Sequence, residues 1–258
     1  NVRVETGSAK EMLSQLEKEE ADWDVAFGVS ADALEEGKEY WQTGKDAWTG
    51  YSAVSFVILY NTNVVTYREL PTGWDSLLEP RWKGRVAVPD PLKSDMAASV
   101  LTEAAKNSEK EEFLDLLAEN MQYQMPETFK EVEQGISDGR YSIGVTSEEA
   151  AKAMLAAGQD VDYIDPEEGE CFFEDGTAIR KRTPNLDASE AFVTYTTCDD
   201  TKWLLRTQLL RQPAEDVAAE NDRSDEDLKQ RYSRQQEVLN IWKLIMEEKS
   251  GSAHEQEQ

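Results

Sequence analysis

The chain of 258 residues carries 53 Asp and Glu against 27 Lys and Arg, which gives a net charge of −26. A field of that sign repels nucleic acid and anionic membrane surfaces, so we expect neither as a partner. Hydrophobic residues make up 39% of the chain and aromatic residues 9%, which is too much apolar material for a disordered polymer and enough for a sizeable core in one or two domains.

The opening residues, Asn1 to Val4, have the features of neither a signal peptide nor a lipid-attachment sequence. No stretch approaches the ~18 consecutive apolar residues of a membrane span. We therefore expect any targeting segment to have been removed.

Two cysteines and one histidine restrict the chemistry. Cys171 and Cys198 are too few for a zinc cluster and too far apart in sequence for a redox CxxC, and both a disulfide and two spare thiols stay open. His254 lies in the polar tail 250–258, which we expect to lack order. Catalysis by histidine, metal ligation by histidine and triads that use histidine are therefore excluded inside the fold. We expect no metal and no cofactor.

Strand and helix patterns alternate from the beginning of the chain. A capping box, Ser8 with Glu11, opens an amphipathic helix. A buried strand follows at 24–29, and Ser30 is the natural cap of the next helix. A second strand covers 53–60.

The middle of the chain repeats a strand followed by a helix with a Ser or Thr cap. A strand at 84–88 enters a proline-bracketed loop that ends at Ser94, where a helix begins. Another strand, 141–145, feeds Thr146 and Ser147 and then a further helix. The helices predicted in this part are 95–106, 110–119, one that begins near Pro126, and 148–157.

Strands that alternate with helices predict a mainly parallel, doubly wound α/β sheet, because a parallel neighbour needs a crossover and a helix supplies it. From 188 to 249 the patterns are almost wholly helical. The core residues expected in this last part are Trp203, Leu204, Leu205, Leu209, Leu239, Trp242 and Ile245.

Helix starts that follow strands are the candidate binding positions. In open α/β sheets ligands bind outside the carboxyl ends of strands, where helix N-termini present unpaired N–H groups and a partial positive charge. A hydroxyl there is either an ordinary cap or part of a cradle for an anion or a hydroxyl group. The hydroxyl residues at such positions are Ser30, Ser94, Thr128, Thr146 and Ser147.

Acidic residues give no catalytic pair. Glu148 and Glu149 fall in a first helical turn, where they either stabilise the helix or accept hydrogen bonds from a solute. The sequence has no Walker motif, no GxGxxG after a strand, no HExxH and no GxSxG. We therefore expect no enzyme.

Six segments, in this order and spacing, cover nearly the whole chain: YNTN at 60–63, LPTGWDSLL at 70–78, PRWKGRVAVPDP at 80–91, GRYSIGVT at 139–146, PEEG at 166–169 with DGTAI at 175–179, and RQP at 211–213 with DV at 216–217. With them the chain resembles the bacterial extracellular solute-binding proteins of ABC transporters, a class that includes ferric-iron, phosphonate and sugar-phosphate receptors.

The resemblance implies a two-lobed α/β fold of the type 2 periplasmic-binding class, with doubly wound sheets and a ligand cleft between the lobes. Lobe one would comprise residues 1–82 plus 168–258, and lobe two residues 83–167. The family begins with a strand and a helix before the segment that matches Val2 to Thr6, so we expect that first strand to be missing here.

The resemblance also implies the function. The protein would capture a small anionic or polyhydroxylated solute, with a phosphonate or sugar phosphate favoured, and deliver it to an ABC transporter permease without chemistry. It would work outside the cytoplasm, in the periplasm or as a cell-surface lipoprotein, as a monomer. The alternatives are a receptor domain for a membrane sensor kinase, a ferric-iron binder and, from another class, an enzyme on the same scaffold.

By family position the resemblance assigns eight residues to the solute. Ferric-binding relatives carry adjacent tyrosines after the strand that matches 141–145, where this chain has residues 146–149 without a tyrosine, so iron is disfavoured. The implied solute-binding residues are Ser30, Ser94, Asp95, Thr128, Thr146, Ser147, Glu148 and Asp175.

Overall fold

The protein is described from a computed structural model that covers residues 2–42, 47–169, 171–209, 211–218 and 225–256, with the backbone alone for 217–218, 225–226 and 250–256. None of the helices in these ranges has the length and apolar character that a membrane crossing requires.

Chain contacts divide the molecule into two units. Unit 1 comprises residues 1–54 and 173–233, and unit 2 comprises residues 55–172 and 234–258. The chain passes between the units three times, within β2 (Thr49–Asn61), β6 (Cys171–Ile179) and α10 (Asp225–Gln256).

These boundaries differ from the lobes expected from the sequence. The expected lobes change at 82/83 and 167/168 and assign the whole C-terminal helix to lobe one, whereas unit 2 takes that helix from residue 234 onward. The lobe assignment stays a prediction about which parts of the chain move together.

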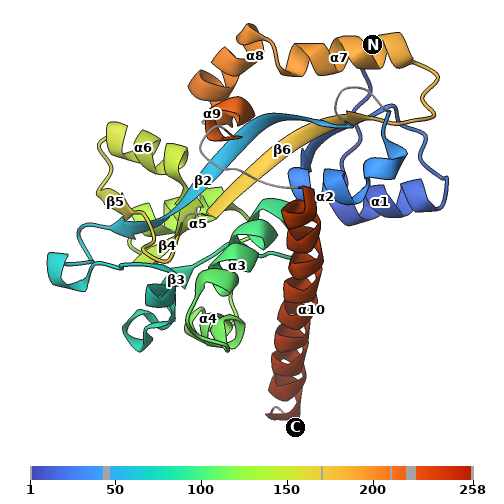
Figure 1. Cartoon of the computed structure of the whole chain (residues 1–258). Helices are drawn as coiled ribbons and strands as arrows, with labels where there is room; N and C mark the ends of the chain where they lie inside the picture. The colour runs from blue at the N-terminus through green and yellow to red at the C-terminus, as the bar shows by residue number, and fades with distance from the viewer. Residues whose placement is uncertain (1, 43–46, 170, 210, 219–224, 257–258) are drawn as a thin grey trace. The chain divides into compact units, whose positions relative to one another are not determined.

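Unit 1 is built on a sheet in which β6 lies between β1 (Val25–Ser30) and β2. Figure 1 shows β6 beside β2. β1 and β6 are antiparallel, and the short strand β7 (Gln212–Pro213) pairs with the first part of β2. The helical segments of unit 1 are α1 (Ala9–Glu17), α2 (Ala31–Glu36), η1 (Lys38–Tyr40), α7 (Leu186–Thr196), α8 (Asp199–Leu204), η5 (Leu205–Leu209), α9 (Ala214–Ala218) and the start of α10.

The start of α1 confirms the predicted capping box. Ser8 Oγ accepts a hydrogen bond from the backbone N–H of Glu11, and the Glu11 carboxylate accepts one from the backbone N–H of Ser8. The cap orients the helix so that its apolar face is buried against α2 and the sheet. The buried cluster that results contains Leu13, Leu16, Ala26, Leu34, Trp41 and Ala178.

Unit 2 contains the second part of β2, flanked by β5 (Val161–Ile164) and β4 (Ile143–Ser147), with β3 (Val86–Ala87) next to β4. Its helical segments are η2 (Tyr67–Glu69), η3 (Trp74–Leu78), η4 (Pro80–Trp82), α3 (Asp95–Asn107), α4 (Phe113–Asn120), α5 (Phe129–Ser137), α6 (Glu148–Ala156) and the rest of α10.

The sheet is mixed, and the prediction of a mainly parallel sheet is wrong. β3 and β4 pair in parallel, whereas β2 runs antiparallel to β4, β5 and β7, and β1 runs antiparallel to β6. β2 belongs to both units, and the later strands β4, β5 and β7 return antiparallel to it.

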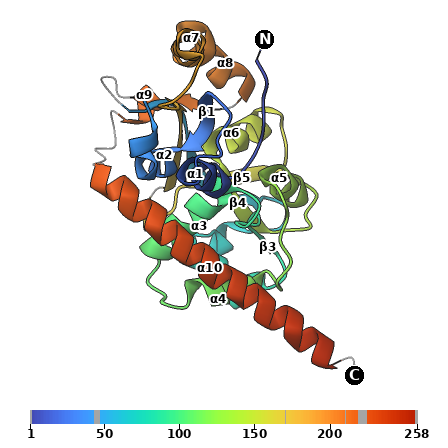
Figure 2. The same cartoon turned by 90° about the vertical axis from the view of Figure 1, so that its right-hand side faces the viewer.

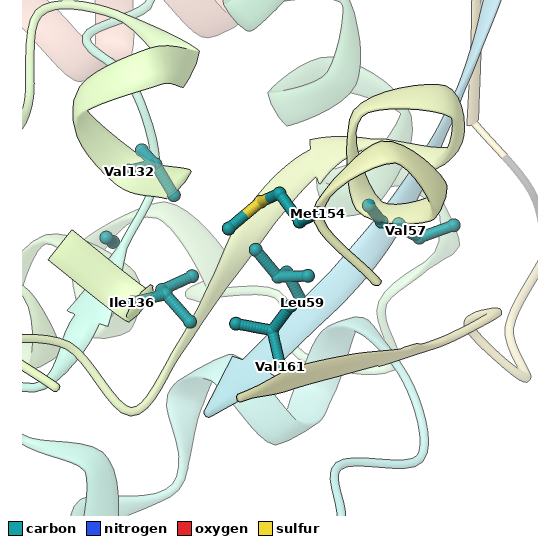
Figure 3. Close-up of a cluster of buried hydrophobic side chains, with 8 residues drawn as sticks. Val57, Leu59, Val132, Ile136, Met154 and Val161 are labelled. Carbon is teal, nitrogen blue, oxygen red and sulfur yellow. The ribbon is translucent and has the colours of Figure 1, made fainter. Parts of the chain in front are cut away.

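The core of unit 2 lies between the sheet and the helices α5 and α6 (Figure 3). Alternate residues of β2 point into it, because side chains on one face of a strand recur with a period of two. The buried residues of this cluster are Val57, Leu59, Ala87, Val132, Ile136, Ala151, Met154 and Val161.

The C-terminal half departs in places from its predicted pattern. Leu205 and Trp242 are buried as predicted, at 1% exposure each, but Trp203 and Leu209 are 58% and 61% exposed, so their assignment to the core is wrong. η5 is a π-helical segment, and its wider turn shifts the side chains around the axis relative to an α-helix.

The expectation that the tail lacks order is also corrected. α10 continues as one helix as far as Gln256 (Figure 2). Residues 257 and 258 lie outside the described range.

Candidate solute-binding site

In unit 2 the parallel strands β3 and β4 end at the same edge of the sheet, because Val86 and Ala87 pair in register with Ile143 and Gly144. The loop after β3 leads to α3, where Ser94 Oγ accepts from the backbone N–H of Ala97 at 3.2 Å. Ser94 is therefore the cap that the sequence predicts.

The starts of α5 and α6 lie at the same edge. Thr128 Oγ1 caps α5 by accepting from Glu131 N, and Ser147 Oγ caps α6 by accepting from Ala150 N, each at 3.2 Å. Phe56 pairs with Ser147 across β2 and β4 and stacks on Phe129, the residue after Thr128, with ring centroids 5.5 Å apart. These contacts bring the two helix starts together.

Two contacts connect the loop before α3 with the segment before α5. The N–H of Asp90, in the loop before α3, donates to the carbonyl of Pro126 at 2.9 Å, and Lys93 forms an ion pair with Glu127. α5 thus begins at Phe129, beyond Pro126, with Thr128 as its cap. The predicted residues at this edge of the unit 2 sheet are Ser94, Asp95, Thr128, Ser147 and Glu148.

Thr146 has a different role from the predicted helix cap. It is a fully buried residue of β4, and its hydroxyl donates to Glu133 Oε1 of α5 at 2.6 Å. Burial raises the pKa of Glu133, while the Thr146 hydroxyl and the Lys130 ammonium act in the opposite direction. Glu133 is a polar residue of this edge that sequence reasoning missed, since only the fold brings α5 against β4.

Carboxylates line this edge of unit 2. Glu148, in the first turn of α6, forms an ion pair with Lys152 at 2.7 Å and accepts from the Tyr163 hydroxyl at 3.5 Å. Its side chain is 22% exposed, so it is held in place but still reaches solvent. Asp95 stands at the start of α3, and Gln235 of α10 donates to its backbone carbonyl at 3.2 Å.

In unit 1 the two remaining predicted residues, Ser30 and Asp175, lie directly opposite each other in the pairing of β1 with β6. Ser30 occupies the N-cap position of α2 as predicted, but its hydroxyl makes no cap hydrogen bond, so the predicted capping interaction is wrong; the residue is 2% exposed. Cross-strand partners share one face of a sheet, with Cβ atoms about 4.5–5.5 Å apart.

Asp175 is the centre of a polar cluster. Its Oδ2 accepts from Ser52 Oγ at 3.0 Å and from a guanidinium nitrogen of Arg211, and the Asp175 and Arg211 side chains are 5% and 21% exposed. Burial, together with the Asp175 charge, raises the pKa of Tyr51, which lies next to Ser52. Sequence reasoning missed Ser52 and Arg211, because the partners are far apart along the chain; the only signal was the motif RQP at 211–213.

Other candidate chemistry is limited in the described residues. They hold no group of three or more His, Cys, Asp and Glu side chains placed to bind a metal ion. Neither Cys171 nor Cys198 is part of a disulfide, so the disulfide alternative is not realised. Cys171 is buried, and hydrogen bonds from Thr201 lower the pKa of Cys198 at the start of α8.

Comparison with known protein families identifies the family of the chain. The sequence model described as "Bacterial extracellular solute-binding protein" matches residues 12–236. The chain therefore belongs to this family, and it is an extracytoplasmic solute-binding protein of the ABC-transporter class. Comparison with curated proteins finds no match.

Solved structures show the same type 2 periplasmic-binding fold. AfuA from Actinobacillus pleuropneumoniae, with fructose-6-phosphate bound, has a TM-score of 0.74 at 14% identity, over 93% of this chain and 88% of that one. The ferric binding protein from Campylobacter jejuni has a TM-score of 0.73 at 15% identity, over 93% and 89%. A protein described as a two-component system protein in signal transduction has a TM-score of 0.65 at 20% identity, over 86% and 81%.

Proposed function

We propose that the protein captures a small anionic or polyhydroxylated solute, with a sugar phosphate or phosphonate favoured, and delivers it without chemistry to the permease of an ABC transporter. The observation that carries the proposal is the convergence of three capped helix starts, those of α3, α5 and α6, at one edge of unit 2. Each cap takes one backbone N–H, so other first-turn N–H groups stay available to oxygen atoms of a solute.

The acids at the same edge support a solute that also carries hydroxyl groups. Asp95 and Glu148 stand in the first turns of α3 and α6. A carboxylate accepts hydrogen bonds and repels an anion, so these acids favour a solute that presents hydroxyl donors beside its anionic group. A phosphorylated sugar supplies both the anion for the N–H groups and the hydroxyls for the acids.

A thermal-shift screen tests the proposal, because a ligand that binds the folded state raises the melting temperature. The probes are sugar phosphates, phosphonates, polyamines and ferric salts. A rise with sugar phosphates or phosphonates alone supports the proposal. No response to any oxyanion, or a response to ferric salts alone, would overturn the proposed solute.

A pair of cap variants connects the response to the site. Thr128→Ala and Ser8→Ala each remove one helix cap, with an expected cost of about 1 kcal/mol. Ser8 caps α1 in unit 1, outside the predicted residues. Only Thr128→Ala should also reduce the solute-induced shift; equal shifts in both variants would count against the edge as the binding place.

In a second candidate function the protein binds a solute in the same way, but a membrane kinase and not a permease recognises the bound form. The fold similarity to a two-component system protein supports a receptor domain whose solute-bound state is sensed by a membrane kinase. Genes beside this one separate the two: a permease and an ATPase favour transport, and a histidine kinase with an extracytoplasmic domain favours sensing.

A further inference from the structure

Gln235 is a buried polar residue on α10. It is 4% exposed, and Val238 and Trp242, about one and two turns further along the helix, are 7% and 1% exposed. Gln235 is thus a polar group beside apolar ones on the buried face of α10. Burial of an amide in such a place costs free energy unless the amide makes hydrogen bonds.

The hydrogen bonds of Gln235 go to the beginning of α3. Its side-chain amide Nε2 donates to the backbone carbonyl of Asp95 at 3.2 Å and to the hydroxyl of Ser99 at 3.3 Å. The amide nitrogen carries two hydrogen atoms, so it can serve both acceptors. Asp95 is the first residue of α3, which lies next to α10 in Figure 1. A side chain near the C-terminus of the chain therefore holds the start of a helix from its middle.

Both partners of this contact belong to unit 2, because unit 2 takes α10 from residue 234 onward. The start of α3 is also held by Ser94, whose Oγ accepts from the backbone N–H of Ala97. Ser94 fixes the chain where it enters the helix, whereas Gln235 fixes the helix from the side. The first turn of α3, one of the three helix starts at this edge of unit 2, therefore has two separate supports.

The contribution of Gln235 to stability should be small. Its hydrogen bonds replace hydrogen bonds with water, and the cost of burying the amide offsets part of the gain. An apolar side chain of the same size would pack in this place without that cost. What an apolar side chain lacks is direction, because only a hydrogen-bonded group fixes the rotation and the height of α3 relative to α10.

We propose that Gln235 is a positioning residue for solute binding, which holds the first turn of α3 in the orientation that its N–H groups need to bind an oxyanion. The proposal rests on the proposed function and deepens it, since Gln235 acts through α3 and does not itself contact the solute. Binding groups must be held within about 0.5 Å of the productive geometry, and supporting hydrogen bonds provide that precision.

Calorimetric titration of the full chain with fructose 6-phosphate and with methylphosphonate tests the proposal. Gln235→Leu should weaken binding of the probe by roughly fivefold, the effect of about one hydrogen bond, and leave the melting temperature within a few degrees of the parent. Gln236→Leu is the matched control, because it makes the same change at the next residue of α10, which is partly exposed, and it should leave the affinity unchanged. Gln235→Met, which keeps the unbranched shape of the side chain, should give the same loss as Gln235→Leu.

Hydrogen exchange locates the effect without any solute. The backbone N–H of Ala98 donates to the carbonyl of Ser94 in the first turn of α3. Gln235→Leu should speed exchange in this turn, whereas Gln236→Leu should not. Unchanged exchange at the start of α3 in Gln235→Leu would overturn the proposal.

Double variants separate positioning of α3 from a general loss of structure. The losses of affinity in Gln235→Leu and Ser94→Ala should not add, because both act on the start of α3. The losses in Gln235→Leu and Thr128→Ala should add, because Thr128 caps α5. Losses that add in both pairs would overturn the proposal.

The proposal and the proposed function can fail separately. A probe that binds the parent and Gln235→Leu equally well, or equal losses in Gln235→Leu and Gln236→Leu, overturns the role of Gln235 alone. If neither probe binds the parent and the wider thermal-shift screen gives no response to an oxyanion, the proposed function is overturned and this role with it.

Discussion

Ser30 and Asp175 face each other across β1 and β6, with the hydroxyl of one and the carboxylate of the other on the same face of the sheet. Asp175 is in turn held by Ser52 and Arg211. The pair shows how a strand that leads into α2 and a strand shared by both units place two distant residues in one polar cluster. The contribution of this cluster to the free energy of unfolding can be measured.

Asp175→Ala should destabilise the protein by about 3 kcal/mol, because it leaves the Arg211 guanidinium largely buried without its counter-charge. Urea unfolding measures the change. Asp216→Ala, which breaks the exposed pair with Arg206, should cost less than about 1 kcal/mol. Similar losses in the two variants would contradict the assignment of a buried pair.

Glu133→Gln should raise the melting temperature near neutral pH by a few degrees. Burial raises the pKa of Glu133 in the folded state, so the charged form weakens folding at pH values above its unfolded pKa, and the amide still accepts from Thr146. The gain should disappear at acidic pH, where the carboxyl is protonated in both states. A gain that is constant with pH would contradict this explanation; Glu131→Gln, on the same helix and exposed, is the control.

Glu168→Ala should cost about 2 kcal/mol of stability, because the carboxylate accepts hydrogen bonds from the backbone N–H groups of Trp74 and Asp75 at 2.9 and 3.0 Å. These bonds fix the loop before β6 to the start of η3. Glu167→Ala is the matched control, since that side chain is exposed, and it should stay within about 0.5 kcal/mol of the parent. Chemical denaturation of both variants measures the two losses, and equal losses would contradict the role given to Glu168.

Leu59→Ala should cost about 3 kcal/mol, since Leu59 is fully buried in the cluster of unit 2 shown in Figure 3. Leu155→Ala, at a 38% exposed position of α6, should cost clearly less. The comparison uses the midpoint of urea unfolding and requires an unchanged slope. A small effect at Leu59 would mean that the cluster collapses easily around the missing atoms.

Salt should stabilise the protein. With 53 acidic and 27 basic residues, the folded chain repels itself, and ions screen that repulsion. The melting temperature should rise between about 0.05 M and 1 M KCl, over which the screening length falls to about 3 Å. A melting temperature that falls with salt would show that ion pairs such as Lys152 with Glu148 outweigh the net charge.

The sequence predicts well what is local. The capping box of Ser8 and the caps Ser94, Thr128 and Ser147 depend on residues three positions away, so their patterns are visible in the chain itself. The prediction of Thr146 as a helix cap is wrong, because its partner, Glu133, is brought close only by the packing of α5 on β4.

Non-local relationships explain the remaining misses. The contact of Arg211 with Asp175 joins two segments whose spacing carries no periodic signal, so the sequence indicates one partner and not the other. The core assignment of Trp203 is wrong because a large aromatic residue is usually buried, and the sequence does not reveal the π-helical segment that follows this one. The mixed sheet follows from one long strand, β2, whose sequence gives no direction for its neighbours.

The alternation of the two units along the chain has a consequence for biosynthesis. Residues 55–172 of unit 2 are contiguous, whereas unit 1 needs residues 1–54 together with 173–233. The N-terminal piece therefore cannot complete its sheet during synthesis until β6 has been made. Until then, the apolar face of α1 is covered only by neighbouring segments of the same piece. The interior piece has its sheet earlier, because β3, β4 and β5 all precede β6 in the chain.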